Sequence, residues 1–276
     1  MPDLKDFIEP LKKIVIDAGE AILEVYNSDQ PIEVQNKSDN SPVTKADHAA
    51  HIIIEKGLSA LSTVYPILSE EGGLPSFNER SGWQRYWLVD PLDGTKEFIN
   101  KNGEFTVNIA LIEGNKAILG VVYVPITGAL YYGGKDMGAW KQLGDHTQTI
   151  KVQPVDFAKE LTVVGSRRHG AEALNALLAK IEPKFSSVNL VSMGSSLKIC
   201  AIAEGKADWY PRLALTCEWD TAAAHAVLVG AGGKIMNIDL QPLSYNQKEE
   251  MLNPFFHAVG DVAFDWEGLI NASSKE

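Results

Sequence analysis

The stretch at residues 87–98 constrains the fold of this chain more than any other. It begins as an apolar strand and ends in two carboxylates, Asp90 and Asp93, with a proline and a glycine that force a tight turn around them. Such a turn lets both carboxylates and the backbone carbonyl of Leu92 point into one small volume. Hard divalent cations such as Mg²⁺ prefer an all-oxygen shell of this kind, usually completed by water and phosphate oxygens. Asp-Pro and Asp-Gly pairs are also ordinary turn formers, so the other carboxylates of the chain must decide between the two interpretations.

Charge and cysteine content limit the partners and the compartment. The 276 residues carry a formal net charge of −11. Such a surface repels polyanions, which argues against a polymeric nucleic acid as partner. A small phosphorylated substrate stays compatible, because metal ions can neutralise it locally. The two cysteines, Cys200 and Cys217, lack a CxxC spacing, which fits a reducing compartment and argues against a disulfide framework or a structural zinc site.

The sequence does not predict membrane insertion. The N-terminus lacks the basic-then-apolar layout of a signal peptide, and no run of about 18 apolar residues is present. We therefore expect a cytoplasmic protein without integral membrane association. Peripheral contact with the inner membrane surface stays open, although no basic amphipathic helix argues for it.

The first half of the chain predicts two helices followed by a meander of strands. Apolar residues repeat at helical spacing over residues 4–27. A second helix should start at Thr44, where Asp47 completes a capping box, and continue to about Leu61. A short strand at residues 65–69 then delivers Glu70, and strand follows strand from residue 86 to about residue 152.

Beyond about residue 155 strands and helices alternate, which indicates an α/β second half. We expect strands at residues 161–164 and 188–191, and helices at 171–181, 195–204 and 220–230. No low-complexity linker separates the two parts. The sequence thus predicts an N-terminal α+β half at residues 1–155 that holds the metal site, packed tightly against a C-terminal α/β half at residues 156–276.

Two more carboxylates stand at predicted element ends. Glu70 follows the strand at residues 65–69, and Asp220 precedes a good helix. Each has an ordinary explanation, Glu70 as a solvated loop charge and Asp220 as a helix N-cap. Their order along one chain, together with Asp90 and Asp93, is what makes them informative.

This arrangement resembles the lithium-sensitive, magnesium-dependent phosphatases of the inositol monophosphatase superfamily. Two signatures of that family stand at residues 87–95 and 219–225, and the segments at 41–47 and 69–72 look like further landmarks in the expected order. Together they span most of the chain. The resemblance implies a layered α/β (α+β) fold, an α/β/α/β/α sandwich.

The resemblance also implies roles for individual residues. It implies two or three Mg²⁺ ions held by a set of carboxylates and one backbone carbonyl: Glu70, Asp90, the carbonyl of Leu92, Asp93 and Asp220. Paired ions can clamp the attacking and leaving oxygens of an in-line displacement by a metal-activated water. Glu70 and the Thr95 hydroxyl would orient that water, with Asp47 accepting the Thr95 proton. The backbone N–H groups of Gly94 and Thr95 would favour the phosphate.

Cationic and hydroxyl residues favour the nucleotide branch of this superfamily. Ser195, Ser196 and Lys198 open a predicted helix and suit a second phosphate. Arg212 stands where inositol-specific members carry an acidic side chain, and a guanidinium suits a phosphate or a purine better than a polyol. Arg167 and His169 add a cationic turn, in which Arg168 departs from the usual family pattern. A solvated turn and a plain helix cap remain the ordinary explanations for these segments.

These features look like the bacterial 3′(2′),5′-bisphosphate nucleotidases. The implied reaction converts adenosine 3′,5′-bisphosphate to AMP and phosphate, which recycles a by-product of sulfate activation. The implied substrate contacts are Glu70, Leu92, Asp93, Gly94, Thr95, Arg167, His169, Ser195, Ser196, Lys198, Arg212 and Asp220. Arg168 and Glu218 receive no role.

Two alternatives accompany this hypothesis. An inositol monophosphatase or a broad sugar-phosphate phosphatase would use the same metal carboxylates, and Lys198 and Arg212 argue against it. A silent nucleotide sensor should have lost a metal carboxylate or Thr95, and this chain has lost none. Inhibition by Li⁺ is implied by the family resemblance alone.

Overall fold

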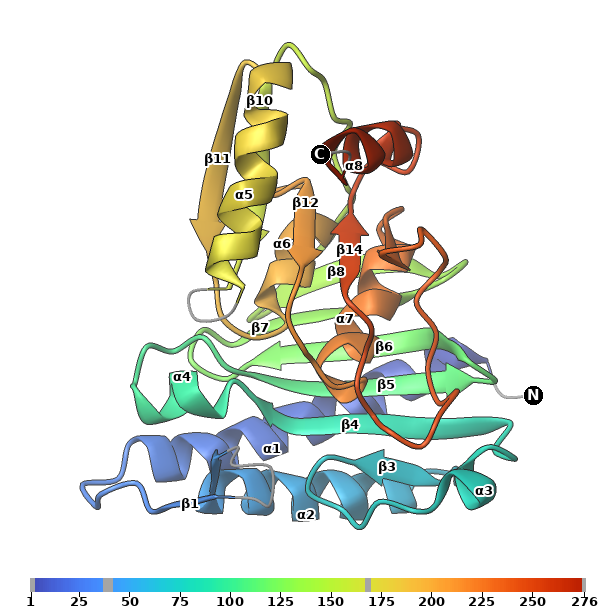
Figure 1. Cartoon of the computed structure of the whole chain (residues 1–276). Coiled ribbons are helices and arrows are strands. Elements are labelled where there is room, and N and C mark those ends of the chain that lie inside the picture. Colours follow the sequence, from blue (N-terminus) through green and yellow to red (C-terminus); the bar gives the residue numbers. More distant parts are fainter. Residues whose placement is uncertain (1–2, 37–41, 167–169, 275–276) are drawn as a thin grey trace.

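The computed structural model describes residues 3–36, 42–166 and 170–274, which form five stacked layers (Figure 1). Helices α1 (Ile8–Tyr26) and α2 (Lys45–Ser59) form the first layer, below a large sheet. Helices α6 (Leu197–Ala203) and α7 (Trp219–Gly230) separate that sheet from a second one, whose far side carries α5 (Ala171–Ile181) and α8 (Trp266–Ser274). The α/β/α/β/α sandwich expected from the sequence is therefore confirmed.

The N-terminal helices follow the sequence pattern closely. A 3₁₀ turn, η1 (Leu4–Phe7), leads into α1, whose apolar face is buried at Leu11, Val15, Ala18 and Ile22. Thr44 caps α2 through a capping box with Asp47, as predicted. The short strands β1 (Val34–Asn36) and β2 (Pro42–Thr44) pair antiparallel just before this cap.

The large sheet has the strand order β3-β4-β5-β6-β7-β8-β9. Its strands are β3 (Ile67–Ser69), β4 (Arg85–Asp93), β5 (Thr106–Glu113), β6 (Lys116–Val124), β7 (Ala129–Gly134), β8 (Gly138–Leu143) and β9 (His146–Thr149). Only the β3–β4 pair is parallel; the others form the predicted antiparallel meander. The short helices α3 (Phe77–Arg80) and α4 (Thr95–Ile99) flank β4.

The second sheet has the order β11-β10-β12-β14-β13. Strands β10 (Glu160–Gly165) and β11 (Ser187–Ser192) match the prediction, and η2 (Glu182–Lys184) extends α5. The sequence pattern predicted no strand between the helices at residues 195–204 and 220–230, but β12 (Trp209–Arg212) lies there. It also missed β13 (Lys234–Asn237), β14 (Phe256–Val259) and α8. These strands are short, and Pro211 inside β12 hides its strand character.

One hydrophobic cluster ties the two sheets together through the middle helices. It contains Leu88 and Val122 from the large sheet, Tyr210 and Phe256 from the second sheet, and the alanines of α7. Helix α7 is buried on almost every side. The first turn of α7, which carries Asp220, is therefore held by packing rather than by a loop.

Two smaller expectations can be checked in the same structure. Cys200 and Cys217 are both free thiols, so no disulfide staples the fold. Among the described residues, none of the helices combines the length and the apolar character that a membrane crossing requires.

The closest approach of α7 to the large sheet depends on a glycine, and this generates a stability prediction. A Cβ added at Gly120 in β6 would lie 2.0 Å from the backbone carbonyl oxygen of Ala223 in α7. Backbone cannot yield locally, so we expect Gly120→Ala to lower the free energy of unfolding by about 3 kcal/mol. Urea denaturation measures this change. Gly73→Ala is the matched control, because a Cβ there meets nothing within 4 Å; equal stability of the two variants would contradict the packing argument.

Candidate metal and phosphate site

Carboxylates from three segments far apart in the sequence converge between the two sheets. Glu70 follows β3, Asp90 lies in β4, and Asp220 lies in the first turn of α7. One carboxylate oxygen from each of these three residues lies within 4.8 Å of the others. The predicted convergence of Glu70, Asp90 and Asp220 is therefore what the structure shows.

The tight turn expected between Asp90 and Asp93 is not formed, because β4 continues as a strand through both residues. The register between β4 and β5 shifts between these two residues, so that a bulge lies where the proline stands. The backbone N–H of Leu92 donates to Asp90 Oδ1 over 3.1 Å. Gly94 then adopts a left-handed φ of +95° and starts α4, a conformation that glycine takes without strain.

Burial and mutual repulsion dominate the electrostatics of the cluster. The pKa of Asp90 is raised well above its ordinary value, first by burial and then by Glu70, Asp93 and Asp220. The pKa of Asp220 is raised in the same way, by burial and by Asp93 and Glu70. The pKa of Asp93 is also raised by burial, but hydrogen bonds and Lys198 oppose the shift.

Such a cluster fits divalent cations. Its donors are oxygens only, and buried carboxylates that repel one another are stabilised by a bound positive charge. Oxygen-only donor sets select Mg²⁺, Ca²⁺ or Mn²⁺ over softer metals. The geometry therefore supports the predicted metal ligands, with the Leu92 carbonyl beside them as a weak acceptor, 3.4 Å from the Thr95 hydroxyl.

Asp47 bridges a helix cap and the site. Its Oδ2 accepts hydrogen bonds from the backbone N–H and the hydroxyl of Thr44, at 2.8 and 2.7 Å. Its Oδ1 accepts the hydroxyl of Thr95 at 3.1 Å. Thr95 makes no cap for α4, since Gly94 is the N-cap and no side chain caps it. The expected Thr95–Asp47 pair is present, and burial raises the pKa of Asp47.

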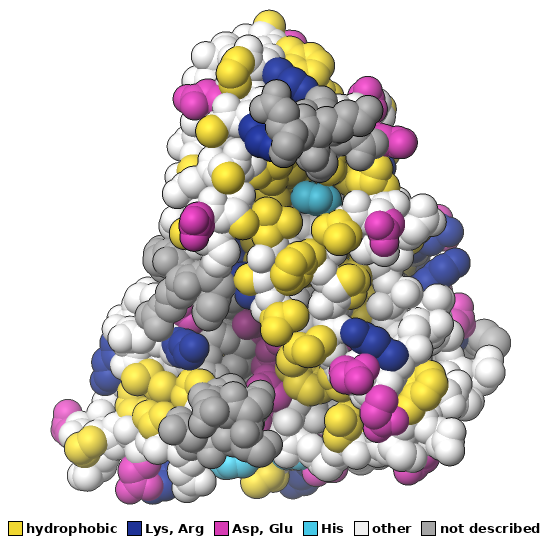
Figure 2. Space-filling model, in the orientation of Figure 1, with side chains coloured by type: hydrophobic (Ala, Val, Ile, Leu, Met, Phe, Trp, Pro, Cys, Tyr) yellow, Lys and Arg dark blue, Asp and Glu magenta, His cyan; other side chains and the backbone are white. Residues whose placement is uncertain are grey.

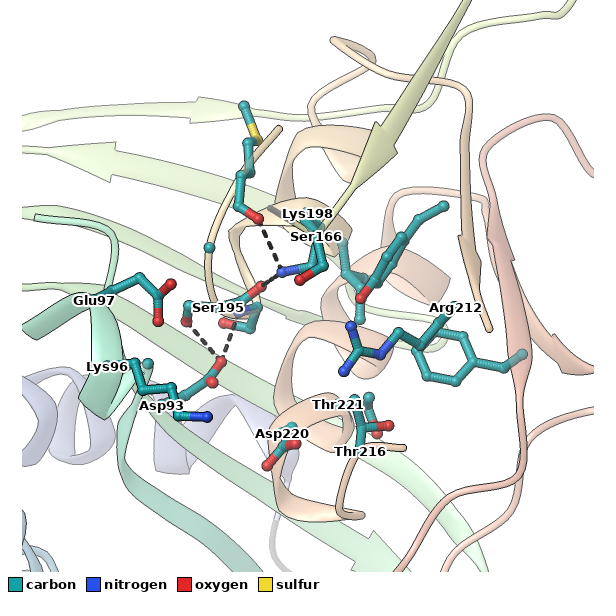
Figure 3. Close-up of a pocket in the computed structure, with 17 residues that line it drawn as sticks. Asp93, Lys96, Glu97, Ser166, Ser195, Lys198, Arg212, Thr216, Asp220 and Thr221 are labelled. Carbon is teal, nitrogen blue, oxygen red and sulfur yellow. Dashed lines mark hydrogen bonds between the residues drawn. The ribbon is translucent and has the colours of Figure 1, made fainter. Parts of the chain in front are cut away.

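The serines before α6 have partners that the sequence analysis did not foresee. Ser195 Oγ and the backbone N–H of Ser196 both donate to Asp93 Oδ2, each over 2.6 Å (Figure 3). The Lys198 amine donates to the carbonyls of Met193 and Ser195, at 3.2 and 2.7 Å. These groups thus brace Asp93, which is predicted to be a metal ligand, and a contact with a second phosphate stays a prediction for Ser195, Ser196 and Lys198.

A cavity of about 150 Å³ opens beside the carboxylates. Figure 2 shows acidic side chains gathered in a hollow near the middle of this face of the molecule. The cavity lining includes both signs of charge: Asp93, Lys96, Glu97, Lys198, Arg212 and Asp220. In Figure 3, Asp93 and Asp220 face the same space as Arg212 and Lys198.

Arg212 is the cation best placed for an anion in this cavity. It lies in β12 and is 8% exposed. Its Nη2 donates to the carbonyl of Leu215 over 2.8 Å, whereas its Nε is buried and has no hydrogen-bond partner among the described residues. Nearby, Lys198 lies 5.4 Å from the ring of Tyr210, and burial lowers its pKa to about 8. Arg167, Arg168 and His169 lie outside the described residues.

Two buried residues of β5 escaped the sequence analysis. The hydroxyl of Thr106 contacts Ser195 Oγ at 2.6 Å and Ser196 Oγ at 2.9 Å. Asn108 accepts from Ser196 Oγ at 3.0 Å. Polar residues two apart in an otherwise apolar strand share one face, and this was the signal that could have identified them.

Glu218, left without a role by the sequence, supports the loop behind α7. Its Oε2 accepts the backbone N–H of Asn246 at 2.8 Å. Asn246 in turn binds the buried Arg80 through its side chain. Burial raises the pKa of Glu218 to about 7. In this structure Glu218 therefore anchors a loop rather than lining the cavity.

Comparison with known proteins identifies related chains. The model of the inositol monophosphatase family matches residues 3–263. A protein of Escherichia coli K12 named 3′(2′),5′-bisphosphate nucleotidase CysQ is 46% identical over 249 residues, which cover 90% of this chain and 98% of that protein. The crystal structure of CysQ from Bacteroides thetaiotaomicron covers 94% of this chain and 99% of its own, with a TM-score of 0.81 at 38% identity. An inositol monophosphatase from Thermotoga maritima shares the fold, with a TM-score of 0.77 at 19% identity.

The raised pKa values generate a prediction for the metal-free protein. Between the ordinary carboxyl pKa of about 4 and the raised pKa values of Asp90 and Asp220, the folded protein holds protons that the unfolded chain has released. Stability must therefore fall as pH rises through this range. We expect Asp90→Asn to raise the midpoint temperature of unfolding in EDTA at pH 8, and to make that temperature fall less steeply as pH rises. The same variant should gain less stability from added Mg²⁺ than the wild type does.

Thermal unfolding in EDTA and in Mg²⁺, from pH 5 to pH 9, measures these effects. Asp145→Asn, at an exposed turn between β8 and β9, is the control and should match the wild type throughout. An Asp90→Asn protein that is less stable than wild type in EDTA at pH 8 would contradict the repulsion argument.

Proposed function

The chain belongs to the inositol monophosphatase family, and on that premise we propose that it hydrolyses the 3′-phosphate of adenosine 3′,5′-bisphosphate to AMP and phosphate in a Mg²⁺-dependent reaction. The observation that carries the proposal is one cavity lined by two carboxylates of the cluster, Asp93 and Asp220, and by the buried cations Lys198 and Arg212. Relatives named 3′(2′),5′-bisphosphate nucleotidase at 46% identity support the same activity.

The proposed metal ligands are the convergent oxygens: Glu70, Asp90, the carbonyl of Leu92, Asp93 and Asp220. Two or three Mg²⁺ ions would neutralise charge on the transferred phosphoryl group and act as Lewis acids there. Their number follows from the family resemblance and is itself part of the proposal.

The hydrogen bond between Thr95 and Asp47 determines how the proposed nucleophilic water is oriented. A threonine hydroxyl carries a single proton, and Thr95 donates it to Asp47 Oδ1 at 3.1 Å. The Thr95 oxygen is then left as an acceptor, and under the proposal the nucleophilic water would point a proton at it. That hydrogen bond would direct a lone pair of the water toward the phosphorus atom. Glu70, whose carboxylate lies close to that of Asp90, would hold the same water.

The cationic end of the cavity supports a substrate with two phosphates. Within the part of the chain that the structure describes, the buried Nε of Arg212 lacks a hydrogen-bond partner, and a buried guanidinium donor left unsatisfied is costly unless a ligand completes it. A 5′-phosphate would supply the missing acceptor, whereas an inositol monophosphate has no second anion to place there. Recycling of adenosine 3′,5′-bisphosphate also places the protein in sulfate assimilation, and we propose a cytoplasmic location for it.

The substrate prediction compares phosphate release from adenosine 3′,5′-bisphosphate and inositol 1-phosphate in parallel, with Mg²⁺. We expect the nucleotide to be preferred, and the activity to disappear on chelation because the carboxylates alone repel the phosphate. Arg212→Gln should raise KM for the bisphosphate at least about tenfold, a loss of about 1.4 kcal/mol in binding.

The matched measurement uses adenosine 3′-monophosphate, which lacks the second anion. Its KM should change little in Arg212→Gln. Faster turnover of inositol 1-phosphate by the wild type would keep the metal chemistry and replace the substrate assignment by the inositol or sugar-phosphate alternative.

A further prediction concerns Thr95. Thr95→Val removes the hydroxyl that orients the water, so kcat should fall by about 10²–10⁴-fold, the usual range for lost acid–base assistance, with a small change in KM. Thr95→Ser, which keeps the hydroxyl, should recover most of the rate. Steady-state kinetics at saturating Mg²⁺ measure both variants. A Thr95→Val enzyme with near wild-type kcat would exclude this role.

A further inference from the structure

A buried network of hydroxyl and amide groups surrounds one oxygen of Asp93. Ser195 Oγ and the backbone N–H of Ser196 donate to Oδ2 over 2.6 Å each. Asn108 Nδ2 approaches the same oxygen at 3.5 Å, a long contact. Among the described residues, no hydrogen bond reaches the other oxygen, Oδ1. The protein thus holds one side of this carboxylate and leaves the opposite side available.

The number of available hydroxyl protons determines which group donates and which accepts in each hydrogen bond of this network. A carboxylate only accepts, so the single proton of Ser195 points at Asp93. The 2.6 Å contact between Ser195 Oγ and Thr106 Oγ1 must then use the proton of Thr106. Ser196 has one hydroxyl proton for two contacts, 2.9 Å to Thr106 and 3.0 Å to Asn108, and it donates that proton to Asn108 Oδ1. The donors run in sequence from Thr106 through Ser195 to Asp93, and each polarises the next.

The backbone at Ser195 has a left-handed conformation, which allows the hydrogen bonds to Asp93. Ser195 has a φ of +55°, which a residue with a Cβ adopts only when its surroundings enforce it. Lys198 supplies part of that enforcement, because its amine binds the carbonyls of Ser195 and Met193. The conformation brings the Ser195 side chain and the Ser196 N–H to the same carboxylate oxygen.

The network also joins the two halves of the molecule. Thr106 and Asn108 belong to β5 of the large sheet, whereas Ser195 and Ser196 precede α6, which packs toward the second sheet. Thr106 is 0% exposed and Asn108 is 1% exposed, and neither lines the cavity. Neither side chain can therefore contact a substrate, so their influence must pass through Asp93 or the serines.

We propose that Thr106 is a positioning residue for the metal ligand Asp93: through Ser195 it fixes Asp93 Oδ2, so that Oδ1 is presented to the metal. The inference rests on the proposed metal-binding role of Asp93. It assigns Ser195 and the Ser196 N–H to the carboxylate instead of to a second phosphate. Partners that orient metal ligands commonly contribute 10–100-fold to metal affinity.

The test measures binding of Mg²⁺ alone by calorimetry, without substrate. Thr106→Val keeps the shape of the side chain and removes its hydroxyl, and we expect the dissociation constant for Mg²⁺ to rise about tenfold. Thr106→Ser keeps the hydroxyl and should restore wild-type affinity. Circular dichroism and thermal unfolding in EDTA check that both variants fold. Unchanged Mg²⁺ affinity in a folded Thr106→Val protein would overturn the proposal.

A second variant keeps the proposal testable if Thr106→Val does not fold. Ser195→Gly removes the direct donor, and glycine accepts the positive φ freely. It should weaken Mg²⁺ binding as well, and adding Thr106→Val should weaken it little further, because Thr106 acts through Ser195. Fully additive losses would overturn the directed network.

Kinetics separate this role from a phosphate contact. Under the proposal, Ser195→Gly raises the Mg²⁺ concentration needed for half-maximal rate equally with adenosine 3′,5′-bisphosphate and adenosine 3′-monophosphate. A rise in KM confined to the bisphosphate, with unchanged Mg²⁺ affinity, would overturn it. Absence of Mg²⁺ binding by the wild-type protein would instead contradict the proposed function itself, and this inference with it.

Discussion

The structure depends on the repulsion among buried carboxylates that it brings together. Asp90 and Asp220 have strongly raised pKa values because burial and their neighbours disfavour the charged forms. The surrounding helices and sheets must hold these carboxylates together against their repulsion. A bound cation would remove this electrostatic cost. The site is thus a place of stored electrostatic strain, which explains why packing around it is so tight.

That rigidity comes from the middle layer. Helix α7 places Asp220 over β4, and it can approach the large sheet closely because Gly120 lies under Ala223. A buried helix with small residues carries one ligand to the others with little freedom to move. The polar network from Thr106 to Asp93 does the same for the opposite side of the site. Apolar packing and buried hydrogen bonds therefore act together on one set of oxygens.

Much of the fold could be predicted from the sequence, because its signals are local. The helical spacing at residues 4–27, the Thr44 cap and the strand-turn pattern after residue 86 all correspond to observed elements. Short strands without a clear period, such as β12 with its internal proline, were missed. They exist because β14 and β10 pair with them, a tertiary cause that local propensity does not contain. The same holds for β13, which lies at the edge of the second sheet and pairs with β14.

The sequence by itself determined the chemistry of the site: which carboxylates are present, how near Asp90 and Asp93 lie along the chain, and the family signatures that they form. Only the tertiary structure decided what each neighbouring polar residue does. Ser195 and Ser196 look like phosphate ligands in the sequence, yet the fold turns them toward Asp93, with Thr106 behind them. The reason is physical: a hydroxyl has the same donor and acceptor wherever it stands in a sequence, and only the groups within 3 Å of it select which of these it uses.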